Sequence, residues 1–542
     1  MKNYNNSINY YLKSSLSIIP ILALFLILGA FFLKYYQYDL ISKDIISIIS
    51  VAKLYADGDI NGAINGYWGP LFSWLLIPFI KFNSSPYFVL YSMKILSLVT
   101  GIFTIIGVRL LSYRFEMDEK IRYLILFSMI FIILYFSLRS NPVDLLLTCF
   151  VVYYLYFIFS PEYRLNSHYG FICGLLGAAA YLTKSYALTF FIAHFLLFNL
   201  FYYFKEQKYK KIILKNLTFG LAIFLIISGS WSVIISDKYE MLTFGTSGAY
   251  NHDAIGPRSV GQHPTEYINQ GFIKPPHEGV TSAWYDPTYF NTDSWSWSPF
   301  ESVEFFKFQL RKIVKNILTL LHIYTLFSYL SLIIIVLYLL LCFKPFNNVI
   351  NSKEIIYPLF TVLLFPLGYL FIALELRYLW LIYILLMLMG GYILNLILKY
   401  NISKIAKAVF SLFFIISFLI LPINTLLPIN TPANCHNGKD FYQWSQIIEN
   451  NYHLKGNIAS NGNADNGNYK RTLHLSYFLG TAYYGFPKKD ISNKELENEL
   501  IKYNIDYYFV WGKSNNEALL SKYNEITDGE IQGLRIYSIK NK

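Results

Sequence analysis

Long apolar runs separated by short polar connections make up most of the first 425 residues. An apolar run of about 20 residues is long enough to cross a bilayer as a helix. The pattern predicts about eleven membrane spans, and we expect them at 15–36, 87–110, 121–138, 143–160, 168–182, 185–204, 213–236, 317–342, 355–374, 378–398 and 405–425. The fold class is therefore that of an all-α polytopic membrane protein.

The pattern changes near residue 430 to a polar, Asn-rich sequence with short mixed elements. Alternation predicts strands at 458–460, 505–511 and 534–539, and amphipathic spacing predicts helices at 442–450 and 494–503. We expect two domains: a membrane domain over 1–429, which includes loops 37–86 and 237–312, and a small α/β domain over 430–542.

Composition supports the membrane class. Hydrophobic residues make up 55% of the chain and charged residues 14%, whereas a soluble domain has nearer a quarter of its residues charged. The net charge of +12 would suit nucleic acid, but these charges collect in short loops, as the positive-inside rule predicts. We therefore expect membrane lipids as partners and no nucleic acid.

The basic loops predict an orientation. They lie at 109–122, 205–211 and 399–407, and placing all three in the cytoplasm puts the N-terminus inside and residues 430–542 outside the cell membrane. Lys2 and Lys13 precede the first apolar run without a small-residue cleavage site, which indicates a retained span and not a signal peptide. The four cysteines provide no disulfide framework.

The apolar run from Tyr67 to Phe82 is short and contains Pro70 and Pro78. If it crossed the bilayer, every later loop would change sides and the basic loops would lie outside. We therefore interpret it as a helix lying at the outer membrane surface.

This topology gathers polar residues from distant parts of the chain at one outer face. A charged side chain at the end of a span is costly unless it is used, so we expect an active site there. Its candidates are Asp44, Arg139, Asp144, Lys184, Glu375 and Arg377.

Each candidate also has a simpler interpretation. Asp144 would suit the cap of the helix that begins beside it. Arg139 and Lys184 would suit interfacial anchors whose charged ends reach the headgroups. Glu375 and Arg377, two residues apart, would suit a local ion pair.

Four short motifs carry a resemblance. They are Ser42-Lys43-Asp44 followed by Ile48, Ala52, Gly58 and Tyr67-Trp68-Gly69-Pro70-Leu71; Asn141 to Leu146; Tyr181 to Tyr186; and Glu375 to Tyr378. Their order and shared sidedness over residues 15–425 resemble the membrane-embedded C-type (GT-C) glycosyltransferases of the family 39/83 kind, which include protein O-mannosyltransferases and the bacterial aminoarabinose transferase.

The resemblance implies a glycosyltransferase whose catalytic carboxylate is Asp44, with Asp39 as the nearby competitor and Asp144 as a second acidic residue. Nucleotide sugars are absent outside the cell, so the expected donor is a sugar on a polyprenyl phosphate and the acceptor a lipid, glycan or protein. A carboxylate accepts the acceptor proton while positive charge develops on the sugar. Lys184 and Arg377 would neutralise the leaving phosphate.

Loop 237–312 is too long for a plain connector and rich in aromatic residues. We expect an ordered lid over the site, with His263 and Tyr67 as substrate contacts, although aromatic residues are also common at membrane interfaces.

Two patterns invite a metal interpretation. Asp57-Gly58-Asp59 pairs two acids, but the same residues form ordinary turns. His252, His263 and His277 are spaced too widely for a compact zinc site. We expect no cofactor.

Two other functions stay open. One is an O-antigen-type ligase or polymerase that transfers a preassembled glycan. The other is a transporter without transferase activity, in which acidic residues near the midplane bind substrate and coupling ions.

Overall fold

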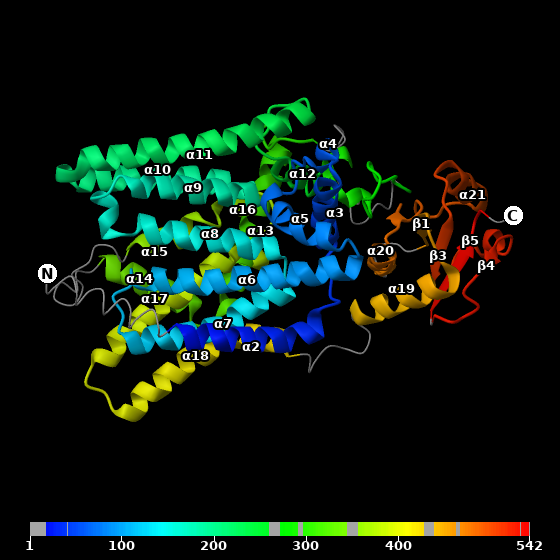
Figure 1. The fold of residues 1–542 in the computed structure, drawn as a ribbon. Helices are drawn as coiled ribbons and strands as arrows, with labels where there is room; N and C mark the ends of the chain where they lie inside the picture. Colours follow the sequence, from blue (N-terminus) through cyan, green and yellow to red (C-terminus); the bar gives the residue numbers. More distant parts are fainter. Residues whose placement is uncertain are drawn as a thin grey trace. The chain divides into compact units, whose positions relative to one another are not determined.

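The computed structural model describes residues 18–540 except 41, 259–270, 291–295, 344–355, 428–437, 462–466 and 532. Packing divides the chain into two compact units. Unit 1 comprises residues 1–35, 94–233 and 309–430, and unit 2 comprises residues 36–93, 234–308 and 431–542. Figure 1 shows the elements of both.

Helices make up the described part of unit 1. In chain order they are α2 (Ile19–Tyr36), α6 (Pro86–Ser112), α7 (Glu119–Arg139), α8 (Pro142–Ile158), α9 (His168–Thr183), α10 (Tyr186–Lys205), α11 (Lys210–Lys238), α13 (Val303–Phe327), α14 (Ser331–Phe343), α15 (Ile356–Leu364), α16 (Leu367–Leu370), α17 (Trp380–Lys399) and α18 (Lys404–Leu426), with α6, α11 and α13 running into unit 2. Short 3-10 turns cover Pro161–Arg164, Gln207–Tyr209 and Leu376–Leu379 (η1, η2 and η7).

Seven of the described helices are long and apolar enough to cross a membrane, and a bent pair would add an eighth. The protein is therefore a multi-pass membrane protein, as the sequence predicts. The expected number of about eleven spans is not confirmed, because the helices in three of the predicted spans, α8, α9 and α15–α16, are shorter than 18 residues.

The predicted span 317–342 contains a break between two helices that together are long and apolar enough for one bent span. Helices α13 and α14 meet at 102°. The backbone N–H of Leu330 donates to Ser328 Oγ, and Ser328 Oγ in turn bonds Ser417 Oγ at 2.8 Å. These side-chain bonds replace the helical ladder at the break.

Helix α17 forms the core of unit 1. Its residues from Trp380 to Met389 are all buried, and the Trp380 ring stacks on Phe136 of α7 with 4.0 Å between centroids. Tyr383 donates to the Phe418 carbonyl of α18. This packing fixes η7, which directly precedes α17.

Helices α9 and α11 approach closely through glycines. A Cβ atom on Gly170 would overlap the backbone of Asn216, and one on Gly174 would overlap the carbonyl of Gly220. Asn216 also accepts from Gly170 N at 2.8 Å and donates to the Tyr163 carbonyl at 2.6 Å. Small residues let membrane helices pack backbone to backbone, and here they fix the course of α9.

Unit 2 begins with the segment after α2. It contains α3 (Lys43–Asp57), α4 (Ile60–Ala63) and α5 (Pro70–Phe82), and a later segment contributes α12 (Ser247–Ala254) and the 3-10 turns η3 (Ala283–Tyr285) and η4 (Pro287–Phe290). Gly58 ends α3 in the left-handed conformation, at φ 87°, and its backbone N–H donates to the carbonyls of Leu54 and Tyr55. The helix predicted within 67–82 is confirmed as α5, which starts at Pro70.

The described residues between 438 and 540, all in unit 2, form a five-stranded sheet with four helices. The strands are β1 (Asn457–Ser460), β2 (Ala482–Tyr483), β3 (Tyr507–Trp511), β4 (Asn524–Glu525) and β5 (Leu534–Ser538), and the helices are α19 (Gly438–Tyr452), α20 (Asn468–Leu479), α21 (Asn493–Lys502) and α22 (Glu517–Leu520). The order is β2-β1-β3-β5-β4, with β1 parallel to β2 and β3, and β5 antiparallel to β3 and β4.

This sheet confirms the predicted α/β fold of the C-terminal region, including its three longer strands and two of its helices. Strands β2 and β4 and helices α20 and α22 are additional. A two-residue strand is too short to show alternation, so sequence pattern alone gave no indication of β2 or β4.

Tyrosine contacts join the C-terminal region to the two earlier stretches of unit 2. Tyr38, Tyr87 and Tyr442 stack with centroids 4.8 to 5.2 Å apart. Tyr477 donates to the Pro86 carbonyl at 2.7 Å, and Tyr483 N donates to the Thr281 carbonyl at 2.7 Å. The predicted division into functional domains near residue 430 stays a prediction.

Candidate active site

Asp44 lies in the first turn of α3 and is 7% exposed. The positive end of the helix dipole favours a carboxylate at this position. The indole Nε1 of Trp284, from η3, donates to Asp44 Oδ1 at 3.4 Å. Ser47, one turn further along α3, donates to the Trp284 carbonyl at 3.1 Å. Asp44 is thus held between its own helix and a segment 240 residues away.

Aromatic rings surround Trp284. Tyr67, Trp68 and Tyr250 each meet it edge to face, with centroids 5.7 to 6.4 Å apart. The hydroxyl of Tyr67 also accepts from Asn251 Nδ2 at 3.1 Å. The described part of loop 237–312 is therefore ordered against the first segment of unit 2, and Tyr67 lies near Asp44 through Trp284.

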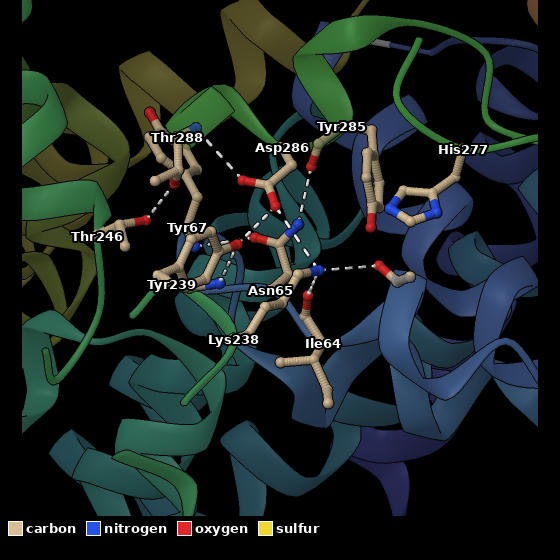
Figure 2. Close-up of polar contacts among 12 residues, drawn as sticks. Ile64, Asn65, Tyr67, Lys238, Tyr239, Thr246, His277, Tyr285, Asp286 and Thr288 are labelled. Atoms are coloured by element: carbon tan, nitrogen blue, oxygen red, sulfur yellow. Dashed lines mark hydrogen bonds and ion pairs between the residues drawn. The ribbon is translucent and has the colours of Figure 1, made fainter. Parts of the chain in front are cut away.

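A buried polar network supports the same segment (Figure 2). Tyr239 donates to Asp286 Oδ2 at 2.5 Å and accepts from Gly66 N at 3.1 Å. Lys238 Nζ donates to the Ile64 carbonyl and lies 3.9 Å from Asp286 Oδ2. Asp286 is fully buried, and burial raises the pKa of its carboxyl, while hydrogen bonds from Tyr239 and Thr288 oppose that rise.

In unit 1, Asp144, Lys184 and Arg377 come together. Lys184 Nζ lies 2.7 Å from Asp144 Oδ1, and Arg377 Nε lies 3.7 Å from Asp144 Oδ2. Arg377 Nε also donates to Glu375 Oε2 at 2.7 Å. Asp144 starts α8, Lys184 ends α9 and Arg377 precedes α17. Side chains that the sequence separates by 40 and 233 positions therefore form one ionic group (Asp144, Lys184, Glu375 and Arg377).

The geometry bears on the simpler interpretations. Asn141, not Asp144, caps α8, because its side chain accepts from Val143 N at 3.1 Å. The Lys184 ammonium pairs with Asp144 and lies 3.8 Å over the Tyr378 ring. The local Glu375–Arg377 pair exists, but Arg377 also reaches Asp144. A lysine and an arginine held together are the cations that suit an anion such as a phosphate.

Tyrosine rings line the ionic group. Tyr369 stacks between Tyr186 and Tyr378, with centroids 3.8 and 4.8 Å away. Tyr378 also donates to Glu375 Oε1 at 3.2 Å. The Lys184 ammonium lies 3.8 and 5.8 Å from the ring centroids of Tyr378 and Tyr369, at distances where the ring faces attract a cation.

The other residues predicted for the site lie outside the ionic group or outside the described residues. Arg139 is the last residue of α7, three positions before α8 begins. His263 lies outside the described residues. Asp39 follows α2, with its backbone N–H on the Tyr36 carbonyl.

Asp59, of the suspected metal motif, caps α4 through Gly62 N at 2.8 Å and lies 3.6 Å from His277. Its role in the described structure is that of a helix cap. Among the residues that the structure describes, no three His, Cys, Asp or Glu side chains are grouped to hold a metal ion. Freedom from a cofactor stays a prediction.

Sequence reasoning missed two residues. Trp284 lies in the loop that the sequence predicts as a lid, and nothing in its local sequence indicates the contact with Asp44. Lys94 lies inside α6, is 1% exposed, and donates to the Leu138 carbonyl at 3.1 Å, beside Arg139. A lone lysine within a predicted span is itself a signal of function, and could have identified Lys94.

Comparisons with known proteins give similarity in structure only. No protein-family model matches the chain, and no curated protein matches it in sequence. The fold is similar to that of ArnT from Cupriavidus metallidurans bound to undecaprenyl phosphate, with a TM-score of 0.54, 10% identity, and coverage of 96% of this chain and 97% of that one. The apo structure of the same protein matches with a TM-score of 0.54 and 9% identity, and the match covers 97% of this chain and 98% of that one. The all-helical membrane fold that the resemblance implies is confirmed as a fold shared with this solved structure.

Proposed function

We propose that this chain is an integral-membrane glycosyltransferase that moves a sugar from a polyprenyl-phosphate-linked donor to a lipid, glycan or protein acceptor. The observation that carries the proposal is the convergence of Lys184, Arg377 and Asp144 at one place. The solved structure of similar fold contains undecaprenyl phosphate, a lipid whose phosphate such cations would suit.

In the proposed reaction, an acceptor hydroxyl attacks the anomeric carbon of the donor sugar. The bond from that carbon to the phosphate oxygen breaks, and the polyprenyl phosphate leaves with the electron pair. Asp44 accepts the acceptor proton and stabilises the positive charge that develops on the sugar. Lys184 and Arg377 neutralise the phosphate, with Asp144 orienting both cations.

The proposed reaction takes place at the outer face of the cell membrane. The basic loops support this sidedness, which puts the N-terminus in the cytoplasm and residues 430–542 outside. It also accounts for a lipid-linked donor, because nucleotide sugars are not available there. No cofactor is assigned, because lysine and arginine can neutralise the phosphate.

The test is transfer of labelled sugar from membrane polyprenyl phosphates into acceptor material, comparing wild type with Asp44→Asn at matched amounts of folded protein. We expect the rate to fall by about 100-fold or more, since a general base contributes roughly 10² to 10⁴. Asp57→Asn is the matched control, because Asp57 is an exposed carboxylate at the other end of α3.

Undiminished transfer by Asp44→Asn would remove Asp44 from the mechanism and turn attention to Asp39 or Asp144. Absence of transfer by the wild type with every polyprenyl-phosphate sugar in the membrane would contradict the proposed donor class.

A further inference from the structure

Hydrogen bonds to Trp284 and to the two residues that follow it hold its turn in place. The Ser47 hydroxyl donates to its carbonyl at 3.1 Å, and Asn65 Nδ2 donates to the carbonyl of the following residue, Tyr285, at 3.0 Å. Two residues on, Asp286 is anchored by Tyr239 at 2.5 Å. Figure 2 shows Asn65, Tyr285 and Asp286 side by side in this network. The turn that carries Trp284 is therefore fixed to the first segment of unit 2.

The burial of Trp284 excludes a role as a sugar platform in this structure. The residue is only 3% exposed, and rings of Tyr67, Trp68 and Tyr250 cover it edge to face. Lys43 Nζ lies 3.7 Å from the centroid of its ring. The indole has one polar atom, Nε1, and that atom faces Asp44.

The chemistry of this contact has one direction. An indole N–H donates and cannot accept, so its partner oxygen must accept. An ionised carboxylate only accepts, and hydrogen bonds to a charged acceptor are the stronger ones. The contact therefore favours the ionised form of Asp44, which is the form that a base requires, and it holds Oδ1 toward the indole.

We propose that Trp284 is a positioning residue that orients the Asp44 carboxylate through its indole N–H, with the Asp286–Tyr239–Asn65 network holding its turn in place. This inference rests on the proposed role of Asp44 as the base. It assigns to loop 237–312 a part in catalysis in addition to the expected role of a lid.

The test compares Trp284→Phe, which keeps an aromatic ring but removes the donor, with Trp297→Phe. Trp297 is the matched control: it is 5% exposed, lies in the same loop, and donates its Nε1 to the His252 carbonyl at 3.0 Å. We expect Trp284→Phe to lower kcat roughly tenfold with KM changed less than twofold. Loss of the donor should also move the acidic limb of the kcat profile to higher pH, because a hydrogen bond to the carboxylate favours its charged form.

Equal kcat values and pH profiles for the two tryptophan variants would overturn the positioning role. If the two tryptophan variants behave alike while Asp44→Asn abolishes transfer in the same assay, only the role of Trp284 is wrong and Asp44 remains the proposed base. If Asp44→Asn retains full transfer, the proposed base is wrong and the inference falls with it.

If the Trp284→Phe protein does not fold, a second measurement tests the contact without that variant. The chain has nine tryptophans, and ¹⁵N-labelled indole resonances of the full chain can be compared between wild type and Asp44→Asn. We expect one resonance to move and, in the wild type, to titrate with a carboxylate. A spectrum in which no indole resonance moves would contradict the contact.

Discussion

At the scale of single residues, the ionic group shows what burial demands of a charge. Asp144 is 3% exposed, and a buried carboxylate is tolerated when it is paired. Its partners, Lys184 and Arg377, come from the ends of other helices. The negative charge of Asp144 is therefore paired with positive charge only in the folded chain. The sequence indicates that these three are unusual, because they are charged at the ends of apolar runs, but not that they touch.

Replacement of Asp144 by Ala is expected to destabilise the protein by about 3 kcal/mol, because it leaves two partly buried cations without their shared anion. Thermal unfolding in detergent measures this. Glu375→Gln is the control: the Glu375 side chain is 51% exposed, so its loss should change stability by less than about 1 kcal/mol. Equal effects of the two substitutions would contradict the arrangement.

At the scale of elements, the helices were predicted better than their breaks. Apolar length located α6, α7, α10, α11, α17 and α18. The bend between α13 and α14 depends on the hydroxyl of Ser328, and one serine in an apolar run gives no reliable sign of a break. The contact of α9 with α11 likewise depends on which glycines face each other, and this is a property of the pair of helices.

Gly174→Ala is expected to destabilise unit 1 by roughly 1–3 kcal/mol, because the added methyl would overlap the Gly220 carbonyl and force α9 and α11 apart. Gly229→Ala, in α11, is the matched control, since no atom lies within 4 Å of its added Cβ. The measurement is the thermal unfolding midpoint of each variant. A Gly174→Ala midpoint equal to that of Gly229→Ala would show that the close approach is absent.

At the scale of the whole molecule, unit 2 is assembled from three stretches of the chain. Residues 431–542 contribute Tyr442 to the tyrosine stack and Tyr483 to a backbone bond with Thr281. The similarity to ArnT extends over 96% of the chain at 10% identity. Two chains of such low identity can share a fold because apolar patterning and packing define it, whereas function depends on the site's specific side chains.

Ending the chain at residue 430 is expected to leave the candidate spans inserted but to make residues 36–93 and 271–290 more sensitive to protease, because their C-terminal partners are lost. Limited proteolysis of membranes containing full-length and shortened chains measures this, with a site in the 205–211 loop of unit 1 as the internal reference. Cleavage of both chains at the same rate within 36–93 would show that this stretch does not depend on the C-terminal region.

The sequence by itself determined the membrane class, most helix positions, the α/β character of the last hundred or so residues and the identity of the charged candidates. These follow from local properties: run length, periodicity and the cost of charge in lipid. Only the tertiary structure decided that Asp144 pairs with Lys184 and Arg377, and that Trp284 donates to Asp44. Such contacts join positions up to 240 residues apart, and no local pattern encodes them, because each depends on how several helices and turns pack together.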